Sequence, residues 1–367
     1  MGKRELLIIV AFVAIGAIAF ELSAPPAPEG RGFSFARFFQ NARRNIRGNP
    51  AVASTTMTGD IPIAATVTEV RLAGANRGVH VVGEERTSIA YELHIESDGP
   101  DDATAIESAK RASLKQDDLG TSLALTVTYP KEGQQWGALV VRVPARLAVR
   151  VSGNGGADVS GVKSVDLDQV SGSTSIREIS GAVTGSHRNG DLTLEKIGAA
   201  DLNLTGSRTK VNGVEHNLML SSRNGRVEIS AAKGLVEIDE TNQEITVREP
   251  AGGVRVTGTS GRVTIEDPRQ EIKVDCRRAE VELTLSQSVP ATLLTTDEPI
   301  RLTLAGTPQI ALDAAASDGG VIHAEDFDLE VKSAEGEQHV AHNFGASPTA
   351  RVTLRSARGD IVIRKAK

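Results

Sequence analysis

Residues 225–266 read GRVEISAAKGLVEIDETNQEITVREPAGGVRVTGTSGRVTIE, and they carry the pattern that decides the fold. Here and on either side, a triplet with aliphatic first and third residues recurs every nine residues, and its middle residue is polar in seven of eight cases. Such alternation is typical of a short β-strand with one buried face. The first positions are Leu218, Val227, Val236, Ile245, Val254, Val263, Ile272 and Val281, and the third are Leu220, Ile229, Ile238, Val247, Val256, Ile265, Val274 and Leu283.

The segments between these strands are rich in glycine and are predicted to be corners. They read SRNG (222–225), AAKG (231–234), PAGG (250–253) and GTSG (258–261). We expect the glycines to adopt the positive φ that a sharp bend requires. Nine residues hold one strand and one corner but no crossover helix, so an alternating strand–helix fold is excluded here.

The number of strands per coil is predicted from self-alignment. Shifting residues 225–248 by 27 gives nine identities, whereas shifts of 18 and 9 give four and six. Residues that stack in successive coils share an environment. The sequence therefore predicts an all-β, right-handed, three-sided parallel β-helix with about 27 residues and three strands per coil. The same shift would stack Glu228, Arg255 and Glu282 as a ladder of alternating charges.

The chain divides into four predicted regions, 1–24, 25–60, 61–145 and 146–367. The last is the β-helix domain, where the nine-residue pattern is found. Residues 61–145 are less regular, with longer strands, and are predicted to form an N-terminal β cap over the unpaired strand edges of the first coil.

This cap is predicted to contain a short helix over residues 102–114. Asp102 would cap its N-terminus, because an Asp side chain can accept a hydrogen bond from a free backbone N–H there. Ile106, Ala109 and Leu114 would be turned inward.

Residues 1–24 are predicted to be a signal-anchor helix or a cleaved signal peptide. Lys3 and Arg4 precede an unbroken uncharged run, Leu6–Phe20. As a helix this run spans roughly 22 Å, whereas a bilayer core needs ~30 Å, so it fits a signal region well and a full span only marginally. Pro25, which follows a small-residue site, disfavours cleavage, so we expect an uncleaved anchor.

Residues 25–60 combine a Pro-containing linker with a basic, Phe-rich amphipathic segment at 33–47, which would lie on a membrane surface or pack on the main domain. Its arginines favour a cytoplasmic body by the positive-inside rule. The order of charge and apolar run at the N-terminus favours export instead. We expect a single-pass, membrane-anchored protein whose body is extracytoplasmic, in the periplasm or at the cell surface.

Charge and cysteine content exclude several classes of protein. The chain carries a net charge of −6. Residues 1–48 hold seven basic and three acidic side chains, a net of +4, so the remainder has a net of −10. An acidic body repels phosphate backbones, and no nucleic-acid partner is expected. The single cysteine, Cys276, excludes an intrachain disulfide and Cys-based metal sites.

The repeated units resemble a known family. GRVEI, GLVEI, GGVRV and GRVTI follow a strand that ends in Pro-Ala-Arg (144–146), and the chain closes with RVTLRSARGDIVIRK (351–365). Together they are similar to the bacterial adhesin-like domain of the DUF4097 type, related to the head domains of autotransporter adhesins, over roughly residues 60–365. The resemblance implies a β-helical, non-catalytic envelope protein anchored by one N-terminal segment. It supplies no catalytic residues, and the segment 33–47 departs from the pattern.

No catalytic, cofactor-binding or metal-ligating residues are assigned from the sequence. In the predicted coils, Asp239/Glu240 and Glu266/Asp267 would stack at one acidic corner, either as a divalent-cation site or as a solvated surface. A calcium-binding nonapeptide is approached once, at residues 153–158, and not in consecutive turns.

Four other side chains are candidates for chemistry. His339 and His342 form an H-x-x-H pair, expected on a loop, which lacks a third metal ligand. Cys276 lies two residues past an inward valine and is expected to be buried and inert. Trp136 is expected in a hairpin loop, either as a sugar-stacking platform or as a capping contact.

Three functions are compatible with these features. The first is a non-catalytic, adhesin-like binding or scaffold protein of the cell envelope, which presents its solenoid surface to an envelope glycan or protein. The second is a polysaccharide-active β-helix enzyme, a lyase or hydrolase, which needs paired carboxylates on an outer face. The third is a membrane-tethered sensor or regulatory partner.

Overall fold

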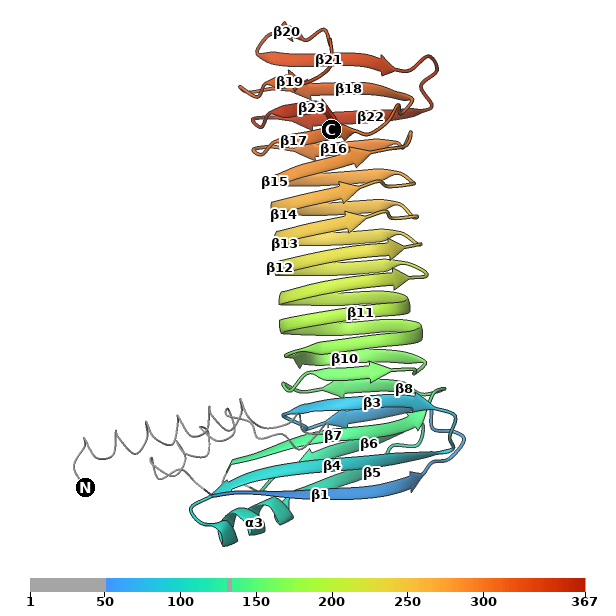
Figure 1. The fold of residues 1–367 in the computed structure, drawn as a ribbon, viewed down its shortest axis with the longest axis vertical. Coiled ribbons are helices and arrows are strands. Elements are labelled where there is room, and N and C mark those ends of the chain that lie inside the picture. Colours follow the sequence, from blue (N-terminus) through green and yellow to red (C-terminus); the bar gives the residue numbers. More distant parts are fainter. Residues whose placement is uncertain (1–50, 131–133, 367) are drawn as a thin grey trace, which may run out of the picture. The chain divides into compact units, whose positions relative to one another are not determined.

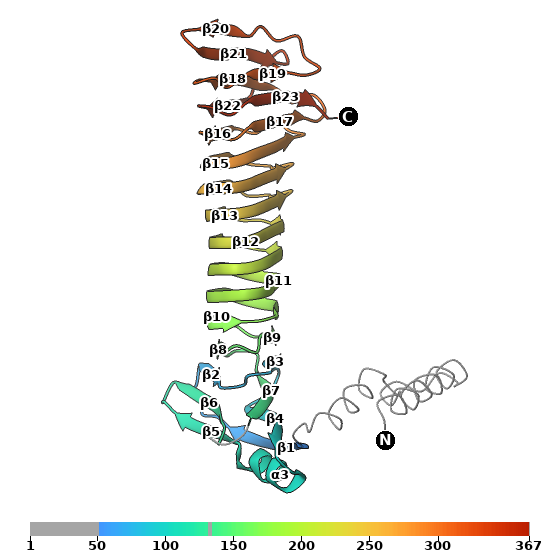
Figure 2. The same ribbon diagram turned by 90° about the vertical axis from the view of Figure 1, so that its left-hand side faces the viewer.

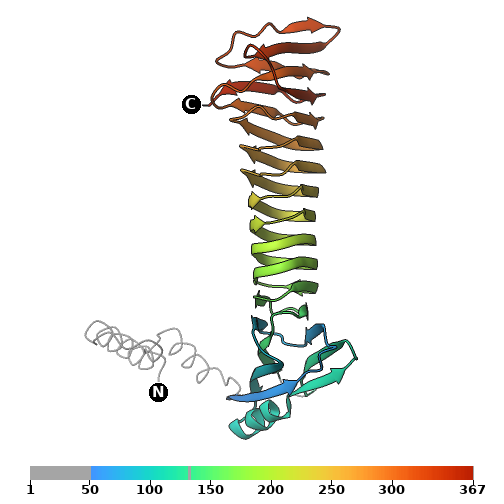
Figure 3. The same cartoon turned by 90° about the vertical axis from the view of Figure 1, so that its right-hand side faces the viewer.

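The computed structural model describes residues 51–130 and 134–366. Residues 52–367 form one compact unit, in which short strands stack coil upon coil along a single axis (Figure 1). Two further views of this unit show the strands of each coil following one another in thin, regular layers (Figures 2 and 3). The all-β prediction is confirmed.

The elements fall into three groups along the axis. The N-terminal group is β1 (Ala51–Pro62), β2 (Glu69–Ala73), β3 (Gly78–Glu84), β4 (Ser88–Gly99), α3 (Asp102–Arg111), β5 (Ser113–Asp118), β6 (Ser122–Thr128) and β7 (Gln134–Pro144). The central group is β8 (Ala148–Ser152), β9 (Ala157–Ser160), β10 (Ser164–Ser171), β11 (Thr174–Val214), β12 (Leu218–Ala232), β13 (Val236–Arg248), β14 (Val254–Glu266) and β15 (Ile272–Leu285). The C-terminal group is β16 (Ala291–Thr295), β17 (Ile300–Leu304), β18 (Ile310–Ala316), β19 (Ile322–Ala324), β20 (Lys332–Ala334), β21 (Glu337–Phe344), β22 (Ala350–Ser356) and β23 (Ile361–Lys365).

Strand register shows that each coil has two sides, not the predicted three. On one side Val236 lies between Leu218 and Val254, and on the other Ile245 is paired with Val263. Each parallel partner is therefore reached after two strands of the nine-residue pattern. The predicted coil size and the predicted ladder of Glu228, Arg255 and Glu282 are wrong. The handedness of the coil stays a prediction.

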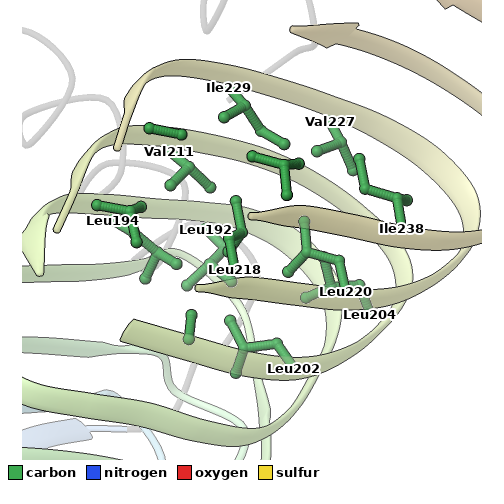
Figure 4. Packing of buried hydrophobic residues seen from close by; sticks show 14 of the residues in the cluster. Leu192, Leu194, Leu202, Leu204, Val211, Leu218, Leu220, Val227, Ile229 and Ile238 are labelled. Atoms are coloured by element: carbon green, nitrogen blue, oxygen red, sulfur yellow. The ribbon is translucent and has the colours of Figure 1, made fainter. Parts of the chain in front are cut away.

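The predicted in–out alternation is confirmed. Every aliphatic residue of the two columns defined by the nine-residue repeat is at most 3% exposed, whereas Met219, between two of them, is 46% exposed. Figure 4 shows leucine, valine and isoleucine side chains from both sides of several coils, packed into the space between them. Burying one such side chain stabilises the fold by about 1.5–3 kcal/mol, and stacking makes the contribution repeat along the axis.

Among the corner glycines, Gly261 adopts the predicted positive φ (135°), but most of the others play a different role. Gly225, Gly234 and Gly252 are not in the left-handed region, but a Cβ atom on any of them would come within 2.3 Å of a carbonyl oxygen in the preceding coil. The left-handed positions of the first two of these corners are instead occupied by Asn224 (φ 54°) and Ala231 (φ 53°). Glycine is needed here because neighbouring coils approach closely.

The first coil of the chain, β2 and β3, does not lie at the end of the stack, because it is inserted between strands that come later in the sequence. The last coil, β22 and β23, is inserted in the same way between earlier strands. Strand β2 pairs with β6 and β8, and β3 pairs with β7 and β9. In the same way, β22 lies between β16 and β18, and β23 lies between β17 and β19. Antiparallel strands then cover both ends, with β4 on β7 and β5 on β6 at one end, and β21 on β18 at the other.

The predicted short helix is present as α3, with two corrections. Asp101, not Asp102, caps it, and its carboxylate accepts a hydrogen bond of 2.8 Å from the Thr104 backbone N–H. This bond lowers the pKa of Asp101. The helix turns Ala109 inward as predicted, together with Ala105, but it leaves Ile106 46% exposed, and Leu114 lies beyond the helix in strand β5.

Several predictions concern residues outside the described part of the chain. The signal-anchor at 1–24 and the amphipathic segment at 33–47 lie there, and the domain boundary after residue 145 stays a prediction. Among the residues that the structure describes, no helix is long and apolar enough to cross a membrane.

Candidate functional site

A groove of about 410 Å³ lies on the outer face of the first coils, across β7, β3, β9 and β11. Its floor is a row of outward positions that carry very small side chains. Ala138 pairs with Gly78, and the register of the next two strands places Gly156 and Ser173 in the same row. Because these residues come from four neighbouring strands, the groove runs across the strands.

One wall of the groove is the next outward row of the same strands, where Val140 is paired with His80, His80 with Asp158, and Asp158 with Ser175. The Asp158 carboxylate joins two of the polar groups. It lies 3.1 Å from the His80 Nδ1 atom and accepts a hydrogen bond of 2.9 Å from Arg177. These partly exposed side chains are therefore held in fixed orientations by one another.

Arg77 forms the other wall, and its neighbours fix its position. Its guanidinium lies over the Trp136 ring, 5.3 Å from the ring centroid, and is 2.5 Å from the Glu96 carboxylate. The preceding residue, Asn76, donates a 2.9 Å hydrogen bond to the Gln135 carbonyl and accepts a 2.8 Å bond from the Gly137 N–H. Trp136 lies in strand β7, not in the predicted hairpin loop, and its face is covered by Arg77.

The glycines of the floor are imposed by close backbone contacts. A Cβ atom on Gly155 would lie 2.3 Å from the Gly78 nitrogen, and one on Gly156, which has φ 80°, would lie 2.1 Å from the Ser173 oxygen. This site is not predicted from the sequence, where residues 153–158 stand out only as an approach to a calcium-binding nonapeptide. The available signal was the run of small residues at outward positions of neighbouring strands.

A second polar feature is closed off inside the stack. Glu240 and Gln243 are only 2% and 3% exposed, and both point inward at one corner of the coil formed by β13. The next coil presents Gly258 beside Glu240 and Gly261 beside Gln243, which leaves room for the two larger side chains. Glu240 Oε1 accepts a 3.2 Å hydrogen bond from the Ser260 N–H.

Burial changes the ionisation of this corner. Desolvation raises the pKa of Glu240 to about 7, although backbone N–H groups of Ser260, Gln243 and Thr259 offset part of the shift, and Asp239 adds to it. Desolvation is the largest cause that raises the pKa of Cys276 to about 12, and the charge of Glu240 is the second. Cys276 is 1% exposed and carries a protonated thiol at neutral pH, as predicted for a buried, inert cysteine.

The predicted acidic corner does not form. Glu240 points into the core on one side of the coil, whereas Glu266 lies on the other side, where it pairs with Arg248 at 3.2 Å. Asp239 is exposed beside Thr257, and Asp267 begins the opposite corner. The error follows from the coil size, because positions three strands apart in the sequence are on opposite sides of a two-sided coil.

The histidine pair is also separated. His339 and His342 lie in strand β21, not in a loop, and residues three apart in a strand point to opposite faces. His339 Nε2 is 3.0 Å from Asp313, and His342 packs against the Phe344 ring. In the described part of the chain, no group of three His, Cys, Asp or Glu side chains is placed to hold a metal ion.

Comparisons with known proteins bear on the family. Solved structures that match at low identity include a "putative adhesin" from Parabacteroides merdae (13% identity, TM-score 0.28, covering 85% of this chain and 97% of that chain). A "putative cell adhesion protein" from Clostridium sporogenes matches with 12% identity and a TM-score of 0.20, covering 87% of this chain and 100% of that chain. A "putative lipid binding protein" from Parabacteroides distasonis matches with 13% identity and a TM-score of 0.22, covering 85% and 97%.

No curated protein matches the chain at a significant level. The Toastrack DUF4097 family, in contrast, matches residues 75–364, which is most of the chain. This range includes the strands of the groove and the stack of coils from β3 into β23. The chain therefore belongs to the Toastrack DUF4097 family.

Proposed function

We propose that the chain is a non-catalytic, adhesin-like binding protein of the cell envelope, held at the membrane by residues 1–24. The observation that carries this proposal is the contrast between the outer surface of the stack, called its wall below, and the core. Exposed charges on the wall are paired in register between coils. The Glu240 carboxyl and the Cys276 thiol, whose pKa values are strongly raised, point into the core, where no polymeric substrate reaches them.

Ion pairs between adjacent coils recur along the outer surface of the stack. Charged side chains at the same position of adjacent coils form ion pairs, including Arg226 with Glu244 at 2.5 Å and Lys233 with Glu215 at 2.8 Å. Each pair contributes little to stability because it is exposed. Together such pairs give a rigid surface of fixed polar groups, which suits recognition of another envelope component.

The proposal is tested with the full-length protein. Protease accessibility in intact cells, combined with the intact mass of the native protein, reports on sidedness and anchoring. Purified full-length protein is then immobilised, and envelope extract is passed over it. We expect an extracytoplasmic body that retains an envelope component. Failure to retain any envelope protein or glycan, or a body that is digested only after the cytoplasmic membrane is broken, would contradict the proposal.

The alternative of a polysaccharide-active enzyme makes a different prediction. Such an enzyme needs two carboxyl groups on an accessible face, one of them with an adjusted pKa. In the part of the chain that the structure describes, the carboxyl group with a strongly raised pKa belongs to Glu240, which is 2% exposed. We therefore expect no release of reducing ends or unsaturated products from a broad polysaccharide panel, with or without added calcium.

A further inference from the structure

We infer that the groove across β7, β3, β9 and β11 binds a neutral oligosaccharide. This inference rests on the proposed binding function and names the ligand class of one site. The groove combines a smooth floor of backbone and small side chains with walls of oriented polar groups. Four observations lead to this ligand class.

The first observation is that the charges lining the groove balance. Arg77 is paired with Glu96, and Asp158 is paired with Arg177. Of these four side chains, Arg77 and Asp158 line the groove, and their opposite charges cancel, so these pairs do not concentrate an anion or a cation there. A neutral ligand avoids the large desolvation penalty of an ion, and its hydroxyls need hydrogen-bond partners in the groove.

The second observation is that the polar groups are fixed before a ligand arrives. His80, Asp158 and Arg177 are joined by contacts of 3.1 and 2.9 Å. Planar guanidinium and carboxylate groups offer several donors or acceptors in a fixed geometry, which matches adjacent hydroxyls of a sugar. Less side-chain entropy is lost on binding when such groups are already held in place.

The third observation concerns the floor. Gly78, Gly156 and Ala138 carry no side chain beyond a methyl group, and Val140 lies in the adjoining row. They provide a smooth surface on which the C–H face of a sugar ring can pack. The hydroxyls at the edge of the ring would then reach the walls, where the Ser175 side chain also lies, while Ser173 adds a hydroxyl at the end of the floor.

The fourth observation disfavours an extended peptide. Peptides add to a sheet through a free strand edge, where backbone groups supply the affinity. Here β7 is paired with both β4 and β3, and β3 with both β7 and β9. Strand β9 is likewise paired with β3 and β11. The groove therefore offers a sheet face and not an edge, and recognition must come from side chains and the floor.

The test uses the full chain and a panel of neutral cello-, malto-, xylo- and manno-oligosaccharides, with binding measured by calorimetry. Ala138→Gln places a longer neutral side chain on the floor. Ala148→Gln is the matched control, since Ala148 is also an outward, half-buried alanine on a strand of the stack but lies outside the groove. We expect at least one oligosaccharide to bind. Ala138→Gln should weaken it by about tenfold or more, and Ala148→Gln should leave it unchanged.

A second variant removes a hydroxyl without filling the groove. Ser175→Ala should weaken the same oligosaccharide several-fold, and both Ser175→Ala and Ala138→Gln should keep the melting temperature of the parent protein. Equal affinity of the parent and Ala138→Gln would overturn the assignment to the groove. If no oligosaccharide binds but envelope extract is still retained, the saccharide inference fails while the proposed binding function stands. If neither is retained, both fail.

Discussion

Glu240 is a charged residue type in an interior position, and the structure shows what makes this possible. Gly258 in the next coil leaves the space that the carboxyl group occupies, since a Cβ atom there would lie 2.2 Å from Glu240 Oε1. The Ser260 N–H donates to Oε1, and the nearby N–H groups of Gln243 and Thr259 also favour the charged form, but Oε2 has no hydrogen-bond partner in the structure. Burial without full compensation favours the neutral form.

The raised pKa of Glu240 predicts a dependence of stability on pH. Its folded-state pKa of about 7 lies above the ordinary value of 4.5. The folded state therefore retains the proton between these values while the unfolded state loses it. Unfolding free energy should fall as pH rises from about 4.5 to about 7, by roughly 3 kcal/mol in total, and this contribution should then stay constant.

Glu240→Gln isolates this effect because it removes the titration and keeps the size of the side chain. Relative to the parent protein, the variant should gain stability between about pH 5 and about pH 8 in urea unfolding. Glu244→Gln, a change at an exposed position of the same coil, is the control for loss of a surface carboxylate. A constant difference between parent and Glu240→Gln at both pH values would contradict a proton held by Glu240.

At individual residues, sequence reasoning succeeded where one physical requirement dominates. Alternation predicted that Ile238 is buried and that Glu237 faces outward, since desolvation strongly separates the two residue types. Alternation also points Glu240 inward, two residues after Ile238, as it does Cys276 after Val274, but it does not tell whether the core has room for a carboxyl group there. That outcome depends on Gly258, whose position beside Glu240 is set by the coil size.

At the scale of one coil, the two sides are chemically alike, and this explains the error in coil size. Self-alignment at a shift of three strands places one side of a two-sided coil over the other side. It therefore aligned equivalent strands and corners, such as Gly225 with Gly252, which do not stack. A better signal was charge complementarity at a shift of two strands, which Arg255 with Glu237 and Arg262 with Glu280 show. Stacked neighbours must complement one another and need not be identical.

Engineered disulfides distinguish the two coil sizes. Thr246 and Thr264 are outward partners in adjacent strands of β13 and β14, so Thr246→Cys with Thr264→Cys should form a disulfide under mild oxidation. Thr246 and Lys273, which a three-sided coil would stack, lie on opposite sides, so the matched pair of substitutions should keep its thiols free. Thiol titration and intact mass measure the difference, with buried Cys276 as a constant background. Oxidation of the second pair but not the first would support a three-sided coil.

The groove shows a limit of sequence reasoning at the scale of the whole molecule. Its floor residues come from strands that are distant in the chain, with Gly78 beside both Ala138 and Gly156. Their proximity follows from the insertion of β2 and β3 between later strands. A periodic pattern predicts that strands stack, but it does not state that an early coil is inserted between two later ones.

The same insertion at the other end makes the last strand a structural element and not a fraying terminus. Strand β23 hydrogen-bonds to β17 on one edge and to β19 on the other, and both Ile361 and Ile363 are fully buried. Its removal would leave a gap one strand wide between two strands that cannot both find new partners. An ordinary repeat array, in contrast, loses only one terminal interface when its last unit is removed.

Truncation after residue 357 is therefore expected to cost several kcal/mol of unfolding free energy, because two buried isoleucines and two sets of ladder hydrogen bonds are lost. Lys332→Gly with Ser333→Gly, in the exposed strand β20, is the control and should cost less than ~1 kcal/mol per site. Urea unfolding followed by circular dichroism measures both. Truncation should also expose β16–β19 to limited proteolysis, while β8–β14 stay protected. A truncated protein as stable as the β20 variant would show that the inserted coil does not hold this end of the stack together.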